Sequence, residues 1–78
     1  MWYVYILQCR DNKLYTGCTQ NIQTRLEQHN NGYVKSTLKR RPVTLLSYTV
    51  FTDKYKAYLF EKYLKTGSGR AFAKRHFI

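Results

Sequence analysis

The residues best suited to chemistry in this chain are two tyrosines, an arginine–histidine pair and one carboxylate. Tyr5 and Tyr15 lie in two apolar segments, and Arg25 and His29 are four residues apart on one side of an expected helix. Glu61 falls on or beside the apolar stripe of a later expected helix. Such a set suits the attack of water on a phosphodiester. Arginine neutralises the phosphate, a carboxylate holds a divalent metal, and tyrosine or histidine handles the proton.

The sequence lacks the residues that several other enzyme classes need. No carboxylate pair has a glycosidase arrangement, and no local motif marks a Cys–His or Ser–His–Asp nucleophile. No glycine-rich loop leads into a helix as in a P-loop or a dinucleotide-binding turn. The 78 residues are expected to form one small domain, 1–78, which leaves no room for a separate nucleotide-binding domain.

The charge of the chain indicates a polyanionic partner. Fourteen Lys and Arg face four Asp and Glu, a formal charge of +10. Such a surface attracts nucleic acid through phosphate contacts and counterion release. Four cations gather in one expected loop, and we expect them to contact the nucleic-acid backbone: Lys35, Lys39, Arg40 and Arg41. The alternative is a solvated basic segment.

The order of apolar segments predicts an α+β fold, β-β-α-β-α-α. The expected strands span residues 2–9, 14–19 and 43–51. The first is apolar almost throughout, so we expect it to be covered on both faces.

Caps and glycines are expected to set the helix ends. Asn21 and Asp53 should cap the first two helices, with Gly32 and Gly67 as their stops, and Ser68 should cap the last.

The turn between the first two strands decides whether Tyr5 and Tyr15 can share a site. A two-residue turn at Asp11–Asn12 would pair positions summing to 23 and place the two rings on opposite faces. We therefore predict an odd-length loop, or a bulge near Gly17. A glycine inside a strand also often marks a close approach to the backbone.

These residues resemble the GIY-YIG nuclease superfamily in their order and spacing. Tyr3-Val4-Tyr5 and, ten residues on, Tyr15-Thr16-Gly17 resemble the two halves of its motif. Arg25, His29 and Glu61 fall where that family has its helix pair and its metal-binding carboxylate. The resemblance covers nearly the whole chain and is greatest to small stand-alone bacterial members.

The resemblance implies a three-stranded, mainly antiparallel sheet flanked by helices, and metal-dependent cleavage of DNA. Tyr15 would be the general base or a hydrogen-bond partner of the attacking water, and Tyr5 would orient that water or the phosphate. Arg25 would bind the scissile phosphate, His29 would handle protons, and Glu61 would hold Mg²⁺ or Mn²⁺. A free tyrosine has a pKa of about 10, so a tyrosine base needs a cation or metal nearby.

The match departs from the family at three places. Tyr3 stands where the family has Gly, and Cys18 stands where several nucleases have Lys. The Asn that some members carry after the carboxylate is missing, and Arg70 is a candidate to take over a phosphate contact.

Other interpretations stay open at this point. The chain could be a catalytically weak or inactive nucleic-acid-binding module of the same fold, or a small basic protein bound to structured RNA. The tyrosines could be packing residues, Arg25 and His29 a solvated helix edge, and Glu61 the partner of Lys62, Lys65 or Arg70.

Compartment and partners follow from composition. Cys9 and Cys18 have no metal-binding spacing, so we expect reduced thiols in the cytoplasm, with a disulfide in a secreted protein as the alternative. No apolar run approaches the ~20 residues of a membrane span, and we expect no signal peptide. Without a separate DNA-binding domain, a partner protein would have to supply sequence specificity. Single-stranded, duplex and branched DNA remain open as substrates.

Overall fold

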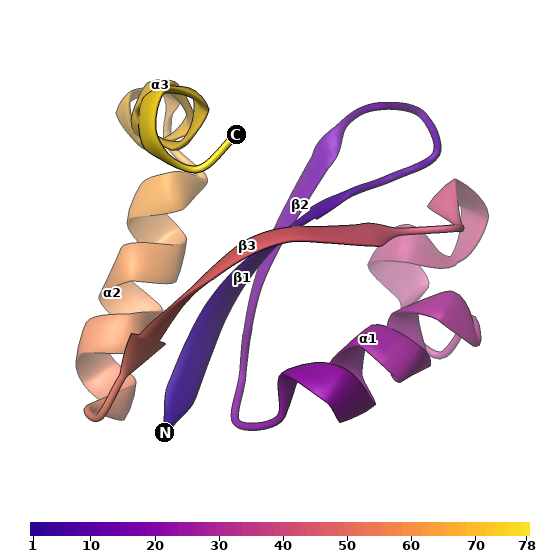
Figure 1. Cartoon of the computed structure of the whole chain (residues 1–78), viewed down its shortest axis with the longest axis horizontal. Helices are drawn as coiled ribbons and strands as arrows, with labels where there is room; N and C mark the ends of the chain where they lie inside the picture. Colours follow the sequence, from indigo (N-terminus) through magenta and orange to yellow (C-terminus); the bar gives the residue numbers. More distant parts are fainter.

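The computed structural model describes all 78 residues as a three-stranded sheet with helices on both faces (Figure 1). The strand order is β2–β1–β3, and both pairings are antiparallel. The elements are β1 (Trp2–Gln8), β2 (Leu14–Thr19), α1 (Ile22–Asn30), a 3-10 helix η1 (Lys35–Arg40), β3 (Thr44–Phe51), α2 (Lys54–Leu64) and α3 (Gly67–His76). The predicted α+β class, element order and antiparallel sheet are confirmed.

Strand β1 lies at the centre of the sheet and is buried on both faces, as predicted. Val4, Tyr5, Ile6 and Leu7 are all buried. Because successive side chains of a strand point to opposite faces, these four residues divide between two cores. Val4 and Ile6 join the core under α2 and α3, whereas Tyr5 and Leu7 join the core under α1.

The layer formed by α2 and α3 is held together by apolar and aromatic contacts. Ala57, Leu64 and Ala73 are buried, and Phe60 and Phe72 pack edge to face beside them with ring centroids 6.4 Å apart. The aromatic pairs follow the quadrupole preference for tilted and T-shaped contacts. This layer is the larger apolar core of the molecule.

The two helices of that layer approach at backbone distance through Gly69. A Cβ atom on Gly69 would overlap the carbonyl oxygen of Tyr63. The chain therefore turns sharply from α2 into α3, which needs a residue without a side chain at this crossing.

The helix ends agree with the predictions except between α2 and α3. The Asn21 side chain accepts from Thr24 N and the Asp53 side chain from Tyr55 N, which confirms both N-caps. Gly32 follows the end of α1 with φ at +83°, the left-handed region that glycine tolerates.

The predicted boundary at Gly67 and Ser68 is wrong. Helix α2 ends at Leu64, and the Thr66 hydroxyl caps α3 by accepting from Gly69 N at 3.1 Å. Gly67 is thus the first residue of α3 rather than the stop of α2. Thr66 takes the N-cap position because it is the first hydroxyl residue after α2 and reaches the free N–H three residues on.

The predicted basic loop is also regular structure, since most of it forms η1. No helix has both the length and the apolar character needed to cross a membrane.

Candidate active site

The hairpin places Tyr5 and Tyr15 on the same face of the sheet. Gln8 pairs with Leu14 and Leu7 with Tyr15, so paired positions sum to 22 and the loop between the strands has five residues. The predicted odd-length loop is confirmed, and the β1–β2 pairing runs without a bulge. The two tyrosine rings lie with centroids 6.5 Å apart, on the side covered by α1.

Gly17 lies directly opposite Tyr5 in the ladder and leaves room for its ring. A Cβ atom on Gly17 would overlap the Tyr5 hydroxyl, so the phenol lies across the bare backbone of β2. The predicted close approach at this glycine is therefore confirmed, and the approaching group is Tyr5.

Helix α1 brings Arg25 and His29 to the Tyr5 hydroxyl. His29 Nε2 lies 2.9 Å from Tyr5 Oη, and Arg25 donates from Nε to the same oxygen at 3.4 Å. Gln28 Oε1 accepts from Arg25 Nη1 at 3.0 Å and helps to hold the guanidinium. The His29 ring also packs edge to face on Tyr15, with centroids 5.1 Å apart. Four of the five predicted catalytic residues therefore form one contiguous cluster.

One residue of this cluster was not predicted from the sequence. Thr37, from η1, places Oγ1 2.8 Å from His29 Nδ1. Thr37 and His29 are both fully buried. Thr37 follows His29 by eight residues in a segment that looked like a basic loop, so only the fold of η1 reveals the contact.

Burial controls the protonation of this cluster. Desolvation, followed by the neighbouring Arg25 charge, lowers the pKa of His29 to about 4, so its ring is neutral near pH 7. Desolvation raises the pKa of Tyr5 above its ordinary value, although the hydrogen bond from Arg25 acts in the opposite direction. Tyr5 is therefore a neutral phenol next to a neutral imidazole.

Glu61 belongs to α2, in the other layer of the molecule. Its side chain is 16% exposed and accepts from Lys65 Nζ at 3.1 Å, one helical turn further along α2. Burial raises the pKa of both Tyr5 and Cys18, and the negative charge of Glu61 adds to both shifts. The salt bridge considered from the sequence is present, with Lys65 as the partner.

The residues around Glu61 fit only a metal site with a single protein ligand. No group of three or more His, Cys, Asp or Glu side chains comes together anywhere in the protein. A site here would have a single protein carboxylate, with water and substrate oxygens as the other ligands. That donor set suits Mg²⁺, which keeps several waters and binds through one or two carboxylates plus phosphate oxygens.

A polar groove runs from Arg25 to Cys18 along the outer edge of the sheet. It has a volume of about 380 Å³ and is lined by residues of β1, β2, α1 and the turn between β2 and α1: Trp2, Cys18, Thr19, Gln20, Asn21, Thr24, Arg25 and Gln28. The guanidinium of Arg25 thus borders both this groove and the Tyr5 hydroxyl.

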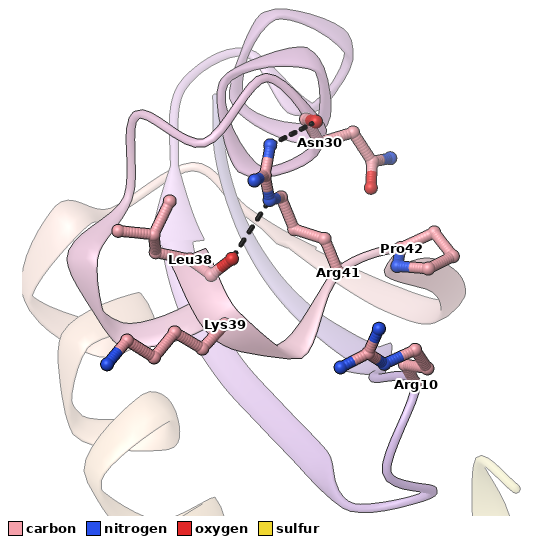
Figure 2. A pocket seen from close by; sticks show the side chains of 6 residues that line it. All are labelled: Arg10, Asn30, Leu38, Lys39, Arg41 and Pro42. Atoms are coloured by element: carbon pink, nitrogen blue, oxygen red, sulfur yellow. Dashed lines mark hydrogen bonds between the residues drawn. The ribbon is translucent and has the colours of Figure 1, made fainter.

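The basic residues predicted to contact nucleic acid do not all lie together in the structure. An open hollow has a volume of about 580 Å³ and is lined by Arg10, Asn30, Leu38, Lys39, Arg41 and Pro42 (Figure 2). Arg41 donates to the carbonyls of Leu38 and Asn30, at 2.9 and 3.3 Å. The hollow lies beyond η1 and does not include the tyrosines.

The remaining predicted cations are outside this hollow. Arg40 forms a salt bridge to Asp11 at 3.1 Å, and Lys35 is exposed at the start of η1. Arg70 is exposed on α3, across the sheet from α1 (Figure 1), so the structure does not bring it to Arg25. Arg10 was missed because it stands alone in the turn after β1.

Comparison with known proteins gives consistent results. The GIY-YIG catalytic domain family matches residues 1–75. A UPF0213 protein of Clostridium perfringens is 47% identical over 66 residues, which cover 83% of this chain and 71% of that protein. A UPF0213 protein of Staphylococcus haemolyticus is 46% identical over 67 residues, covering 85% of this chain and 82% of that protein.

A solved structure agrees with these sequence matches. The solution NMR structure of a UPF0213 protein of Bacillus halodurans superimposes with a TM-score of 0.60 at 35% identity, covering 96% of this chain and 82% of that one. Because the family match spans almost the whole chain, the chain belongs to the GIY-YIG family of nuclease-type domains.

Proposed function

We propose that the protein is a metal-dependent endonuclease that hydrolyses DNA phosphodiester bonds. The observation that carries the proposal is the convergence of Tyr5, Tyr15, Arg25 and His29 in one cluster, whose Arg25 also lines a groove that reaches Cys18. A guanidinium and phenol hydroxyls gathered in one cluster, with a carboxylate on the neighbouring helix α2, match the needs of phosphodiester hydrolysis.

Arg25 is the proposed ligand of the scissile phosphate. Its guanidinium borders the groove, and hydrogen bonds to Tyr5 and Gln28 fix its position before substrate arrives. A guanidinium held in advance stabilises developing phosphate charge without having to reorganise during the reaction.

The two tyrosines have different environments and so different proposed roles. Tyr15 is only half-buried and packs against the His29 ring, and it is the candidate general base. Tyr5 is buried and its raised pKa keeps it protonated, which suits a hydrogen-bond donor that orients the water or the phosphate.

Glu61 is the proposed ligand of Mg²⁺ or Mn²⁺. A bound ion would polarise the phosphate and lower the pKa of a coordinated water. Lys65, which now pairs with Glu61, is 54% exposed, so it can move into solvent at little cost when the carboxylate takes another partner.

The test is a cleavage assay on purified protein. Labelled single-stranded, duplex and branched DNA are incubated with Mg²⁺ or Mn²⁺, with and without a chelator. We expect chelator-sensitive internal cleavage of at least one substrate, lost in Arg25→Ala while the variant remains folded. Binding of all three DNAs without cleavage, across both metals, would reject the enzyme and leave a binding module of the same fold.

A further inference from the structure

The groove that Arg25 borders also contains the single tryptophan of the chain. Trp2, the first residue of β1, lines this groove together with Arg25. The Trp2 side chain is half-buried, because it packs against the core under α2 and α3 and also faces the groove. It is the only aromatic residue among the eight that line the groove. The groove therefore combines one cation with one flat apolar surface.

The polar groups of the groove suit a ligand that is rich in acceptors. The side-chain oxygen of Asn21 already accepts from Thr24 N, and that of Gln28 accepts from Arg25, so the amide NH₂ groups of both side chains remain free to donate. No carboxylate lines the groove. Its volume of about 380 Å³ lies in the range of small-ligand sites, about 300–1,000 Å³. A nucleotide has the matching chemistry, with anionic acceptor oxygens and a planar base.

A mobile lysine lies over the Trp2 ring. Nζ of Lys54, the first residue of α2, is 5.2 Å from the ring centroid. Lys54 is exposed and takes part in neither salt bridge of the protein, so its side chain is free to move. A cation–π contact at an exposed site is weaker than the stacking of a base on an aromatic ring. A base can therefore displace the ammonium group, which then stays close to the negatively charged nucleic-acid backbone.

We propose that Trp2 is a base-binding residue, on whose indole ring an unpaired base stacks next to the phosphate bound by Arg25. The inference rests on the proposed function for the position of that phosphate, and it adds a contact to a base. The base has to be unpaired because a base inside a duplex is stacked on its neighbours and offers no free face. Every base has such a face, so this contact strengthens binding without selecting a sequence.

The fluorescence of Trp2 tests the proposal directly, because no other tryptophan contributes. Wild-type protein is titrated with a short single-stranded oligonucleotide and with an abasic oligonucleotide of the same length, in chelator so that metal-dependent cleavage is prevented. Excitation at the red edge of the absorption spectrum selects Trp2 over the eight tyrosines. We expect saturable quenching by the oligonucleotide with bases and none by the abasic one, although the anisotropy of labelled oligonucleotides shows that both bind. Equal quenching by both, binding without quenching, or no binding of either overturns the proposal.

A matched set of variants gives the second test. Trp2→Leu keeps an apolar side chain and removes the ring, whereas Trp2→Phe keeps a ring. We expect Trp2→Leu to weaken binding of the oligonucleotide with bases on the order of tenfold and to leave binding of the abasic one unchanged, with Trp2→Phe closer to wild type. Tyr55→Leu makes the same kind of change at an exposed position of α2 outside the groove and should leave both affinities unchanged. Equal weakening for both oligonucleotides in folded Trp2→Leu overturns the proposal.

The two tests also separate this proposal from the nuclease function. Quenching by the oligonucleotide with bases, together with no cleavage in Mg²⁺ or Mn²⁺, would reject the nuclease function and leave the base-binding site in place. Cleavage of DNA by a protein whose Trp2 fluorescence does not respond to bound DNA would reject the base-binding site and leave the nuclease function in place.

Discussion

The two helical layers that cover the sheet are built from different chemistry. The α2–α3 layer buries only carbon-rich side chains, with Ala57, Leu64 and Ala73 at its centre. The α1–η1 layer buries His29 and Thr37 and ties them to Tyr5. Strand β1 serves both layers at once through its alternating side chains. Stability and candidate chemistry are thus separated across one strand.

Glu61 is the exception to this separation. It belongs to α2, yet its charge acts on Tyr5, which lies under α1. Both layers pack on the edge strand β2, where Gly17 leaves room for the Tyr5 ring and Cys18 packs against the core under α2.

The largest effect is expected for Glu61→Gln, which keeps the shape and removes the charge. If the carboxylate holds the metal, cleavage should fall on the order of 10³-fold while DNA binding persists. Folding should change little, because the pair with Lys65 involves a half-exposed lysine. Steady-state cleavage rates in a Mg²⁺ and Mn²⁺ titration measure the loss of activity. Glu27→Gln, on the exposed side of α1, is the control, and equal rates for both variants would contradict the assignment.

Gly17→Ala tests the polar layer without removing any functional group. The new methyl group would overlap the Tyr5 hydroxyl and push the ring from its place beside His29 and Arg25. Cleavage should fall about 10²-fold, the typical result of a misplaced group in an active site. Gly67→Ala is the matched control because a methyl group there meets nothing within 4 Å. A Gly17→Ala protein with wild-type cleavage would show that Tyr5 need not lie over this backbone.

Gly69→Ala makes the corresponding change in the apolar layer. Here the methyl group would overlap a backbone carbonyl, that of Tyr63, so α3 must shift away from α2. We expect the free energy of unfolding to fall by about 2–3 kcal/mol, as for overpacked cores. Urea denaturation measures the loss. Cleavage per folded molecule should stay close to wild type, and a loss of cleavage without a loss of stability would break the proposed division between the layers.

The sequence was sufficient for the parts of the site that depend on local spacing. Strand parity required an odd loop between Tyr5 and Tyr15, and helical periodicity placed Arg25 and His29 on one side of α1. It could not reveal Thr37, because that contact depends on how η1 folds back on α1. Nor could it separate Thr66 from Ser68 as the cap of α3, since both are hydroxyl residues one position from Gly67, where the helix starts.

The buried histidine should also make stability depend on pH. The unfolded chain protonates His29 near its ordinary pKa of 6.5, whereas the folded protein does so only near pH 4. Between these values the unfolded state binds more protons, so stability falls as the pH is lowered. The expected loss from this group is about 2 kcal/mol between pH 6.5 and 5.

Denaturation at several pH values measures this slope in two variants. His29→Gln should lose this part of the dependence, although it will also disturb the contacts to Tyr5 and Thr37. His76→Gln, at an exposed position on α3, is the control and should keep the wild-type slope. Parallel slopes for His29→Gln and wild type would mean that His29 does not resist protonation in the folded state.

The smallest effect is expected from single surface charges, and it distinguishes the two layers as DNA-binding surfaces. Lys39 borders the hollow beside Arg10 and Arg41, so Lys39→Glu should remove a phosphate contact and weaken DNA binding several-fold. Its slope of log affinity against log salt should become shallower by about 0.7–0.9, the value for one phosphate. Lys74→Glu, exposed on α3, changes the net charge by the same amount in the other layer and should have less effect. Fluorescence anisotropy over a salt titration compares the two. Equal losses of affinity in the two variants would mean that net charge alone attracts the DNA. The α1–η1 layer would then not be a preferred binding surface for the DNA backbone.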